Sequence, residues 1–271
     1  MQPVALTIAG SDPSGGAGIQ ADLKTFHQFG VYGEAVITLI TVQNTVGFER
    51  VECLPPRLIA DQIRAAISDI PPLAAKTGAL GNREIIQAVA DLAAHLQFPL
   101  VVDPVIASKH GGALLTTDAI DALKTRLLPR AYLVTPNLVE AELLTGAEVR
   151  DLSGMRAAAE RLLEMGAGAA IIKGGHLFED PIDILLDRRG FVEFPAQRIE
   201  TRHTHGTGCT FSAAITALLA RGFELTDVVR SAKDYITEAI RTNPGLGAGS
   251  GPLNHHAAAR LPNRPSAVPE E

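Results

Sequence analysis

The chain has 271 residues, of which 46% are hydrophobic and 20% charged, so it can bury a large core as an α/β protein. A net charge of −6, 4% aromatic residues and no basic blocks argue against nucleic acid as a partner. We expect no signal peptide and no membrane span, and the two cysteines suit a reducing cytoplasm better than a disulfide framework. A small-molecule enzyme in the cytoplasm is therefore the first expectation.

Short apolar runs rich in β-branched residues alternate with amphipathic stretches along the chain. Strands are predicted at residues 4–9, 36–42, 74–77, 100–105, 132–135 and 169–173. Helical spacing of apolar residues follows in 59–70, 211–219 and 225–240. Repeated βα units predict a mostly parallel sheet with helices on both faces. Residues 182–186 and 191–194, joined by a polar turn, predict a late antiparallel hairpin at the sheet edge.

The chain contains no linker long enough to divide it, so we expect a single domain over residues 1–261. Residues 262–271 carry three prolines without apolar periodicity, which predicts a mobile tail.

Polar and glycine-rich segments follow the predicted strands. Ligands of such sheets bind outside the carboxyl ends of the strands, where segments distant in sequence converge. We therefore expect one site built from residues 10–18, 43–44, 103–104, 135–140, 173–176 and 204–209.

The segment from Thr204 to Thr210 packs small residues into a turn that opens into a helix. Free amides at a helix start, with the helix dipole, can hold a phosphate or oxyanion, and Gly206 and Gly208 let an anion approach closely. Cys209 would be the reactive side chain, and a helix N-terminus is expected to lower the pKa of its thiol. By itself, the segment is equally consistent with a glycine-rich loop around a buried cysteine.

The glycine-rich loops match neither of two common nucleotide-binding motifs well. Gly16-x-Gly18-x-x-Ala21 formally matches the dinucleotide fingerprint, but its distance from the strand and the lack of a following acid argue against it. The phosphate-loop pattern GxxxxGK[ST] does not occur.

Several side chains at strand ends have both a functional and a structural interpretation. The amide of Gln43 would suit an aminopyrimidine, or it would bond local backbone. Asn137 and Glu140 share one helical face and, with Asp103, could order water around Mg²⁺, or they could simply start a helix. Lys173 could reach a phosphate or remain solvated. Cys53 is predicted to be structural. The histidines 203, 205, 255 and 256 form no tetrahedral zinc set, and we expect them to be exposed or to contact ligand-binding residues instead of a ligand.

In their order along the chain, these segments resemble the ribokinase-like superfamily, and within it the hydroxymethylpyrimidine/phosphomethylpyrimidine kinases of thiamine biosynthesis. The resemblance runs from Ala5 to about His255. It is carried by residues 6–12, 15–24, 43–45, 103–105, 135–137, 173–176, 204–210 and 251–255. His110 stands where relatives usually have Ser, so the lid over the substrate is expected to differ.

The resemblance implies an ATP-dependent kinase that phosphorylates 4-amino-5-hydroxymethyl-2-methylpyrimidine and then its monophosphate. It implies Cys209 as general base where most of the superfamily has Asp, with Gly206 and Gly208 at the transferring phosphoryl group. The other implied residues are Gln43, Ala17, Asp22 and Gly10 for the pyrimidine, Thr204, Thr207, Lys173 and Asn137 for ATP, and Glu140 and Asp103 for Mg²⁺.

The resemblance also implies a homodimer, and a monovalent cation is a further candidate cofactor. Two alternatives stay open: a pyridoxal or pyridoxine kinase of the same superfamily, and a pyrimidine-binding protein without activity.

Overall fold

A computed structural model describes residues 2–107, 111–112, 114–175, 177 and 180–263. Within these residues the chain forms a nine-stranded sheet with the order β3-β2-β1-β4-β5-β6-β7-β8-β9. The elements in chain order are β1 (Val4–Ser11), α1 (Gly18–Gln28), β2 (Tyr32–Gln43), β3 (Phe48–Cys53), α2 (Pro56–Asp69), β4 (Ala74–Thr77), α3 (Arg83–Ala93), β5 (Leu100–Val102), α4 (Thr117–Ala122), η1 (Leu123–Leu127), η2 (Leu128–Arg130), β6 (Leu133–Val134), α5 (Leu138–Thr145), α6 (Leu152–Glu164), β7 (Ala170–Ile172), β8 (Ile182–Asp187), β9 (Gly190–Pro195), α7 (Thr207–Ala220) and α8 (Leu225–Arg241).

The strands from β2 through β1, β4, β5 and β6 to β7 pair in parallel. At the two edges, β3 pairs antiparallel with β2, and β8 and β9 form an antiparallel hairpin. The predicted fold class, a mostly parallel α/β sheet with a late edge hairpin, is thereby confirmed.

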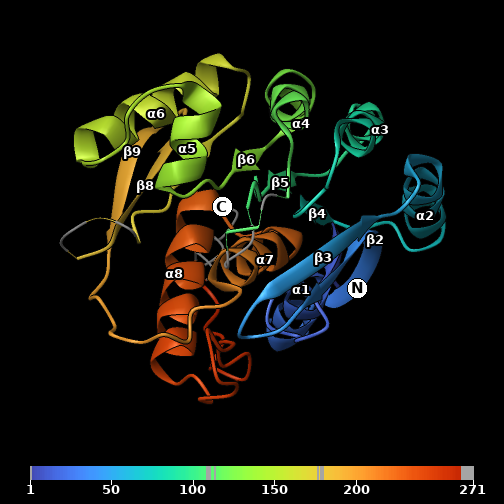
Figure 1. Ribbon diagram of the computed structural model, residues 1–271. Coiled ribbons are helices and arrows are strands. Elements are labelled where there is room, and N and C mark those ends of the chain that lie inside the picture. Colours follow the sequence, from blue (N-terminus) through green and yellow to red (C-terminus); the bar gives the residue numbers. More distant parts are fainter. Residues whose placement is uncertain (1, 108–110, 113, 176, 178–179, 264–271) are drawn as a thin grey trace, which may run out of the picture.

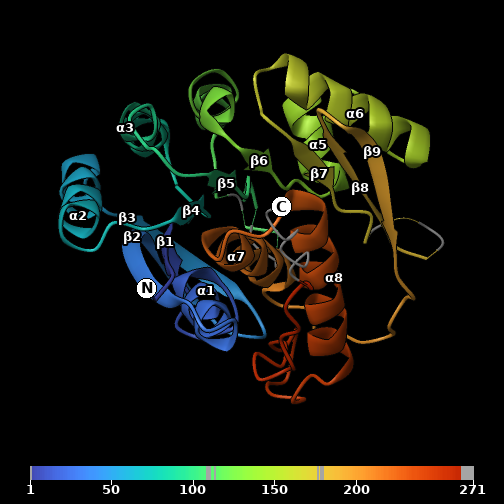
Figure 2. The same ribbon diagram turned by 180° about the vertical axis from the view of Figure 1, so that it is seen from behind.

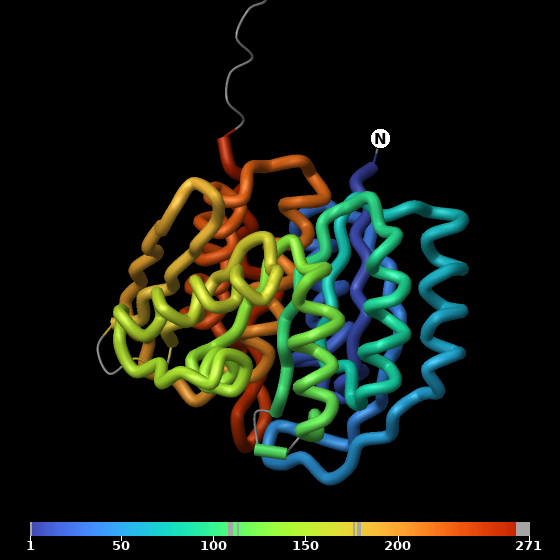
Figure 3. Tube along the Cα trace, turned by 90° about the horizontal axis from the view of Figure 1, so that it is seen from above, coloured from blue at the N-terminus to red at the C-terminus, as the bar shows by residue number. Residues whose placement is uncertain are grey.

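Helices cover both faces of the sheet (Figures 1 and 2). Helices α1, α7 and α8 pack on one face, and α2 to α6 pack on the other. Figure 3 shows α2, α3 and α4 side by side across their face. Because the central strands are enclosed by both layers, their side chains are buried on both sides, as the four residues of β4 illustrate.

The strands differ from the sequence prediction in several places; β2, for example, begins at Tyr32 instead of Val36. Strand β3 was not predicted, because its exposed charged residues Glu49, Arg50 and Glu52 mask a strand at the sheet edge. Strand β5 ends at Val102 rather than Val105.

Several helices begin at side chains that accept a backbone N–H. Asn82 accepts the amide of Ile85 at the start of α3, and Asp151 accepts that of Gly154 at the start of α6. No helix in the described part of the chain is long and apolar enough to cross a membrane. The expected lid residues Lys109 and His110, and most of the expected tail, lie outside the described residues.

Candidate active site

A cavity of about 710 Å³ opens at the carboxyl ends of the parallel strands. All six segments that the sequence predicted to converge contribute to its lining, including Gly10, Gln43, Asp103 and Lys173. The convergence of these segments into one site is therefore confirmed for the described residues.

The turn before α7 forms one wall of this cavity. Gly206 precedes the helix in the left-handed region, with φ of 83°. A Cβ added there would overlap the carbonyl oxygen of Gly16. Only glycine therefore lets the turn lie against the first glycine loop, residues 10–18. The hydroxyl of Thr207 donates to the Thr204 carbonyl at 2.8 Å, and the Thr210 amide donates to Gly206 at 2.9 Å. The Thr207 amide also donates to the Thr204 carbonyl, at 3.4 Å. The turn is thus held firmly, and the next amides, those of Gly208 and Cys209, have no intrahelical partner and can bind an anion.

The side chain of Cys209 is half-buried in the first turn of α7 and lines the cavity. Burial raises the pKa of its thiol to about 12; the charge of Lys76 opposes this, while Asp22 and Asp103 add to it. The expectation that the helix start would lower this pKa is therefore wrong for this structure. Desolvation and two nearby carboxylates outweigh the helix dipole.

Three charged side chains, those of Lys173, Asp103 and Glu140, lie beside the turn. The ammonium of Lys173 lies 3.2 Å from Asp103 Oδ1 and 3.9 Å from Glu140 Oε2. A Cβ at Gly208 would lie 3.3 Å from the Lys173 ammonium, which places this cation directly at the turn. Burial lowers the pKa of the Lys173 ammonium, but the negative charges of Asp103 and Glu140 raise it by more. Its pKa is therefore raised overall, and the group stays charged.

Asp103 is buried and held by several donors. Besides Lys173, the hydroxyls of Ser212 and Thr135 donate to it at 3.1 and 3.2 Å. Burial raises the pKa of Asp103, but Lys173 and Lys76 more than offset this, so it remains an anion.

Asn137 and Glu140 form a capping box at the start of α5. The Asn137 side chain accepts the Glu140 amide at 2.9 Å, and the Glu140 carboxylate accepts the Asn137 amide at 2.8 Å. Burial raises the pKa of Glu140 to about 7, with Lys173 opposing and Asp103 adding. The helix-start interpretation is thus confirmed, and both residues also line the cavity.

Three of the four residues expected at the pyrimidine line the same cavity as the turn. Gly10, Ala17 and Gln43 line the cavity, and Gln43 ends β2 with a half-buried side chain. Asp22 does not line it: this carboxylate is fully buried behind the site, paired with Lys76 at 2.7 Å. Direct contact between Asp22 and a substrate is therefore not possible in this structure.

One contact within the site was not predicted from the sequence. His205 Nε2 lies 2.8 Å from Asp12 Oδ2, and the same carboxylate oxygen accepts the amide of Ala17 at 2.9 Å. The first glycine loop is thereby fastened to the turn before α7. Asp12 belongs to a segment that the resemblance includes, but nothing local in the sequence indicates its partner.

Further charged residues, in the cavity and buried behind it, were not predicted from the sequence. Lys233 of α8 pairs with Asp183 of β8 at 2.6 Å, and both line the cavity. Lys76 lies in the middle of the buried strand β4, and a charged residue in a non-alternating apolar run was the signal that could have identified it.

Among the described residues, no three His, Cys, Asp or Glu side chains are placed to bind a metal ion together. Any divalent ion here would therefore depend on water and ligand oxygens, which is how Mg²⁺ is commonly held.

Comparison with known proteins adds independent information. A family model described as phosphomethylpyrimidine kinase matches residues 12–254. The chain is 50% identical over 256 residues to the thiamine biosynthesis bifunctional protein ThiED of Geobacter sulfurreducens, which covers 94% of this chain and 52% of that protein. It is 46% identical to the hydroxymethylpyrimidine/phosphomethylpyrimidine kinase of Streptomyces coelicolor, over 93% of this chain and 94% of the relative. The chain thus spans about half of the first relative and nearly all of the second.

Among solved structures, the fold is similar to that of Bacillus subtilis pyridoxal kinase in complex with ADP. The TM-score is 0.88 and the identity 39%, covering 95% of this chain and 98% of the other.

Proposed function

Because the chain belongs to the phosphomethylpyrimidine kinase family, we propose that it transfers phosphoryl groups from ATP in thiamine biosynthesis. Its substrates are 4-amino-5-hydroxymethyl-2-methylpyrimidine and the monophosphate of that alcohol, which becomes the diphosphate. One observation carries the proposal: Gln43, Lys173 and Cys209 line the same cavity. An amide suited to an aminopyrimidine, a phosphate-binding cation and the helix turn thus face one space.

The pyrimidine binds between Gly10, Ala17 and Gln43. A primary amide offers a donor and an acceptor side by side, which complements a ring nitrogen next to an exocyclic amine. The hydroxymethyl group then points toward the turn before α7, since that turn lines the same cavity.

ATP binds in the part of the cavity lined by Thr204, Thr207, Lys173 and Asn137. The amides from Gly206 to Cys209 hold the transferring phosphoryl group, and the Lys173 ammonium balances its charge. Phosphoryl transfer depends mainly on such positioning and charge stabilisation.

The acidic residues of the cavity fit Mg²⁺ bound largely through water. Glu140 and Asp103 supply two carboxylates near the phosphate position, and the Lys173 ammonium lies between them. Such an ion, when bound, neutralises charge on the phosphate oxygens. A monovalent cation is a further candidate cofactor.

Cys209 takes the proton of the hydroxymethyl group in the first step. Since its thiol is neutral in the free protein at pH 7, it must ionise within the loaded site before it can act as a base. The second step needs this less, because its acceptor phosphate is already ionised.

Residues 1–261 act as a single kinase domain. Cytoplasmic location agrees with the supply of ATP and with two free cysteines, and the resemblance to the kinase family suggests a homodimer. Light scattering of the purified protein tests the homodimer, and a monomeric mass would contradict it.

Pyridoxal is a second candidate substrate, because the similar B. subtilis structure is a pyridoxal kinase. ADP release measured side by side with hydroxymethylpyrimidine, its monophosphate and pyridoxal tests all of these proposals. We expect turnover with both pyrimidines. Turnover with pyridoxal alone would replace the main proposal, and turnover with none would favour a binding protein without activity.

A further inference from the structure

A fully buried ion pair lies directly behind the turn before α7. Lys76 of β4 and Asp22 of α1 meet at 2.7 Å, and neither side chain has any solvent exposure. The hydroxyl of Thr7, from β1, donates to the second oxygen of Asp22 at 2.6 Å. Three elements of the fold therefore hold this pair in place.

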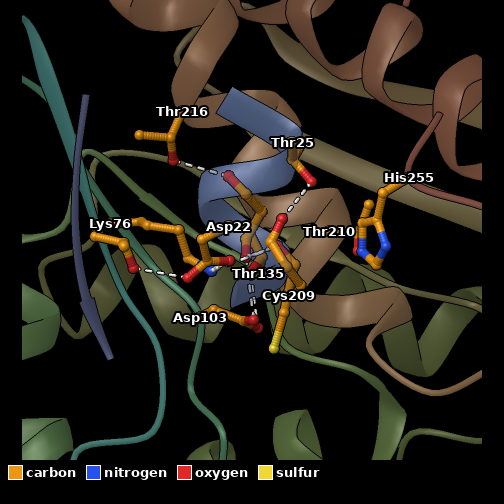
Figure 4. Close-up of polar contacts among 12 residues, drawn as sticks. Asp22, Thr25, Lys76, Asp103, Thr135, Cys209, Thr210, Thr216 and His255 are labelled. Carbon is orange, nitrogen blue, oxygen red and sulfur yellow. Dashed lines mark hydrogen bonds and ion pairs between the residues drawn. The ribbon is translucent and has the colours of Figure 1, made fainter. Parts of the chain in front are cut away.

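The ammonium of Lys76 also reaches the first turn of α7. It donates to the carbonyl of Cys209 at 3.4 Å, and the hydroxyl of Ser212 donates to the same carbonyl at 3.1 Å. Ser212 Oγ also lies 3.1 Å from Asp103 Oδ2, so its single hydrogen is shared between the two acceptors, and Asp103 pairs with Lys173. The buried pair is thus one end of a continuous chain of contacts that ends at the cavity wall, and Figure 4 shows Lys76, Asp22, Asp103 and Cys209 close together.

Stability does not account for a charged pair in this position. Two charges in a fully enclosed site lose solvation that their attraction only partly returns, and apolar side chains of similar size often fill such a site equally well. The pair is also oriented, since its ammonium and not its carboxylate contacts the turn. Consistently, Lys76 lowers the pKa of the Cys209 thiol more than Asp22 raises it.

We propose that Lys76 is a positioning residue for phosphoryl transfer: its ammonium, held by Asp22, fixes the first turn of α7 and supplies a permanent positive charge beneath the phosphoryl group. Asp22 orients this cation and partly screens it. The two residues therefore act on an anion at the turn with opposite signs. This inference rests on the proposed function, because it assumes that the turn binds phosphate.

The test compares three variants: Lys76→Met, Asp22→Asn and the double variant that combines them. The affinity for AMP-PCP, an ATP analogue whose terminal phosphoryl group is not transferred, is measured by calorimetry, and ADP release is measured with ATP and hydroxymethylpyrimidine. We expect AMP-PCP to bind on the order of tenfold more weakly to Lys76→Met, and at least as tightly as wild type to Asp22→Asn, because the charges act on the anion with opposite signs. The double variant, whose core holds no unpaired charge, should fold normally and still lose about tenfold in kcat/KM.

A purely structural pair would behave differently. It would weaken AMP-PCP binding in both single variants, and the double variant would regain wild-type turnover; either result overturns the inference. If Lys76→Met fails to fold, Asp22→Asn and the double variant still decide. The matched control neutralises the exposed pair Arg126–Asp91 in Arg126→Met/Asp91→Asn, which should leave both readouts unchanged. Absence of turnover in the wild type would refute the proposed function, while the AMP-PCP affinities would still test the role of Lys76.

Discussion

Replacement of Gly206 by alanine tests the role of the turn most directly. The residue lies at φ of 83°, which costs an alanine about 1–2 kcal/mol. In addition, the new Cβ would lie 2.8 Å from the Gly16 carbonyl carbon and would overlap its oxygen. Both obstructing atoms belong to the backbone, so no side-chain rotation relieves the contact. The glycine loop and the turn must therefore move apart by roughly 1 Å or more, and a misplacement of that size can cost about 100-fold in rate.

Gly222, at the other end of α7, provides the matched control. It also has a left-handed backbone, with φ of 80°, but a Cβ there would meet nothing within 4 Å. The free energy of unfolding of Gly222→Ala should therefore fall only by the backbone cost of about 1–2 kcal/mol, with unchanged turnover. That of Gly206→Ala should fall by the same cost and by about 1–3 kcal/mol more, because the added Cβ overpacks the contact with Gly16.

Urea unfolding and ADP release on both variants provide the measurement. We expect kcat/KM for hydroxymethylpyrimidine to fall at least 100-fold in Gly206→Ala and to stay near wild type in Gly222→Ala. If Gly206→Ala retained the activity of Gly222→Ala, the close packing of the two loops would be irrelevant to catalysis, and our account of the turn would be refuted.

Three further variants test individual side chains. Cys209→Ala should reduce the first phosphorylation by on the order of 100-fold or more and the second by much less, with the fold intact; equal losses in separate assays of the two steps would contradict a base role. Gln43→Ala should raise KM for the pyrimidine about tenfold through lost hydrogen bonds, and an unchanged KM would remove it from the pyrimidine site. Glu140 has its pKa raised to about 7, so its favourable contribution is complete below about pH 4.5 and is lost as pH rises through about 7. Glu140→Gln should therefore gain stability relative to wild type between pH 5 and pH 8, by up to about 3 kcal/mol in urea unfolding, and a pH-independent difference would show that this pKa is not raised.

Local patterns determined much of this protein before any contact was known. Runs of β-branched residues and helical periodicity identify most strands and the helices α2, α7 and α8, because backbone preference and burial on one or two faces shape the pattern of neighbouring residues. The rule that parallel strands present their carboxyl ends at one edge then brings Gln43, Lys173 and Cys209 together. These patterns did not predict the edge strand β3, because its exposed charged residues are typical of loops as well as of edge strands.

The tertiary structure alone decided the electrostatics of the site. Lys76 and Asp22 are 54 positions apart in the sequence, and His205 and Asp12 are 193 positions apart. No local pattern could therefore pair them. The Cys209 thiol shows the consequence most clearly. Its place at a helix start suggests an acidic thiol, but desolvation of the thiol and the carboxylates of Asp22 and Asp103 raise its pKa to about 12. Desolvation and Coulomb interactions depend on distances through space, and only the folded chain sets those distances.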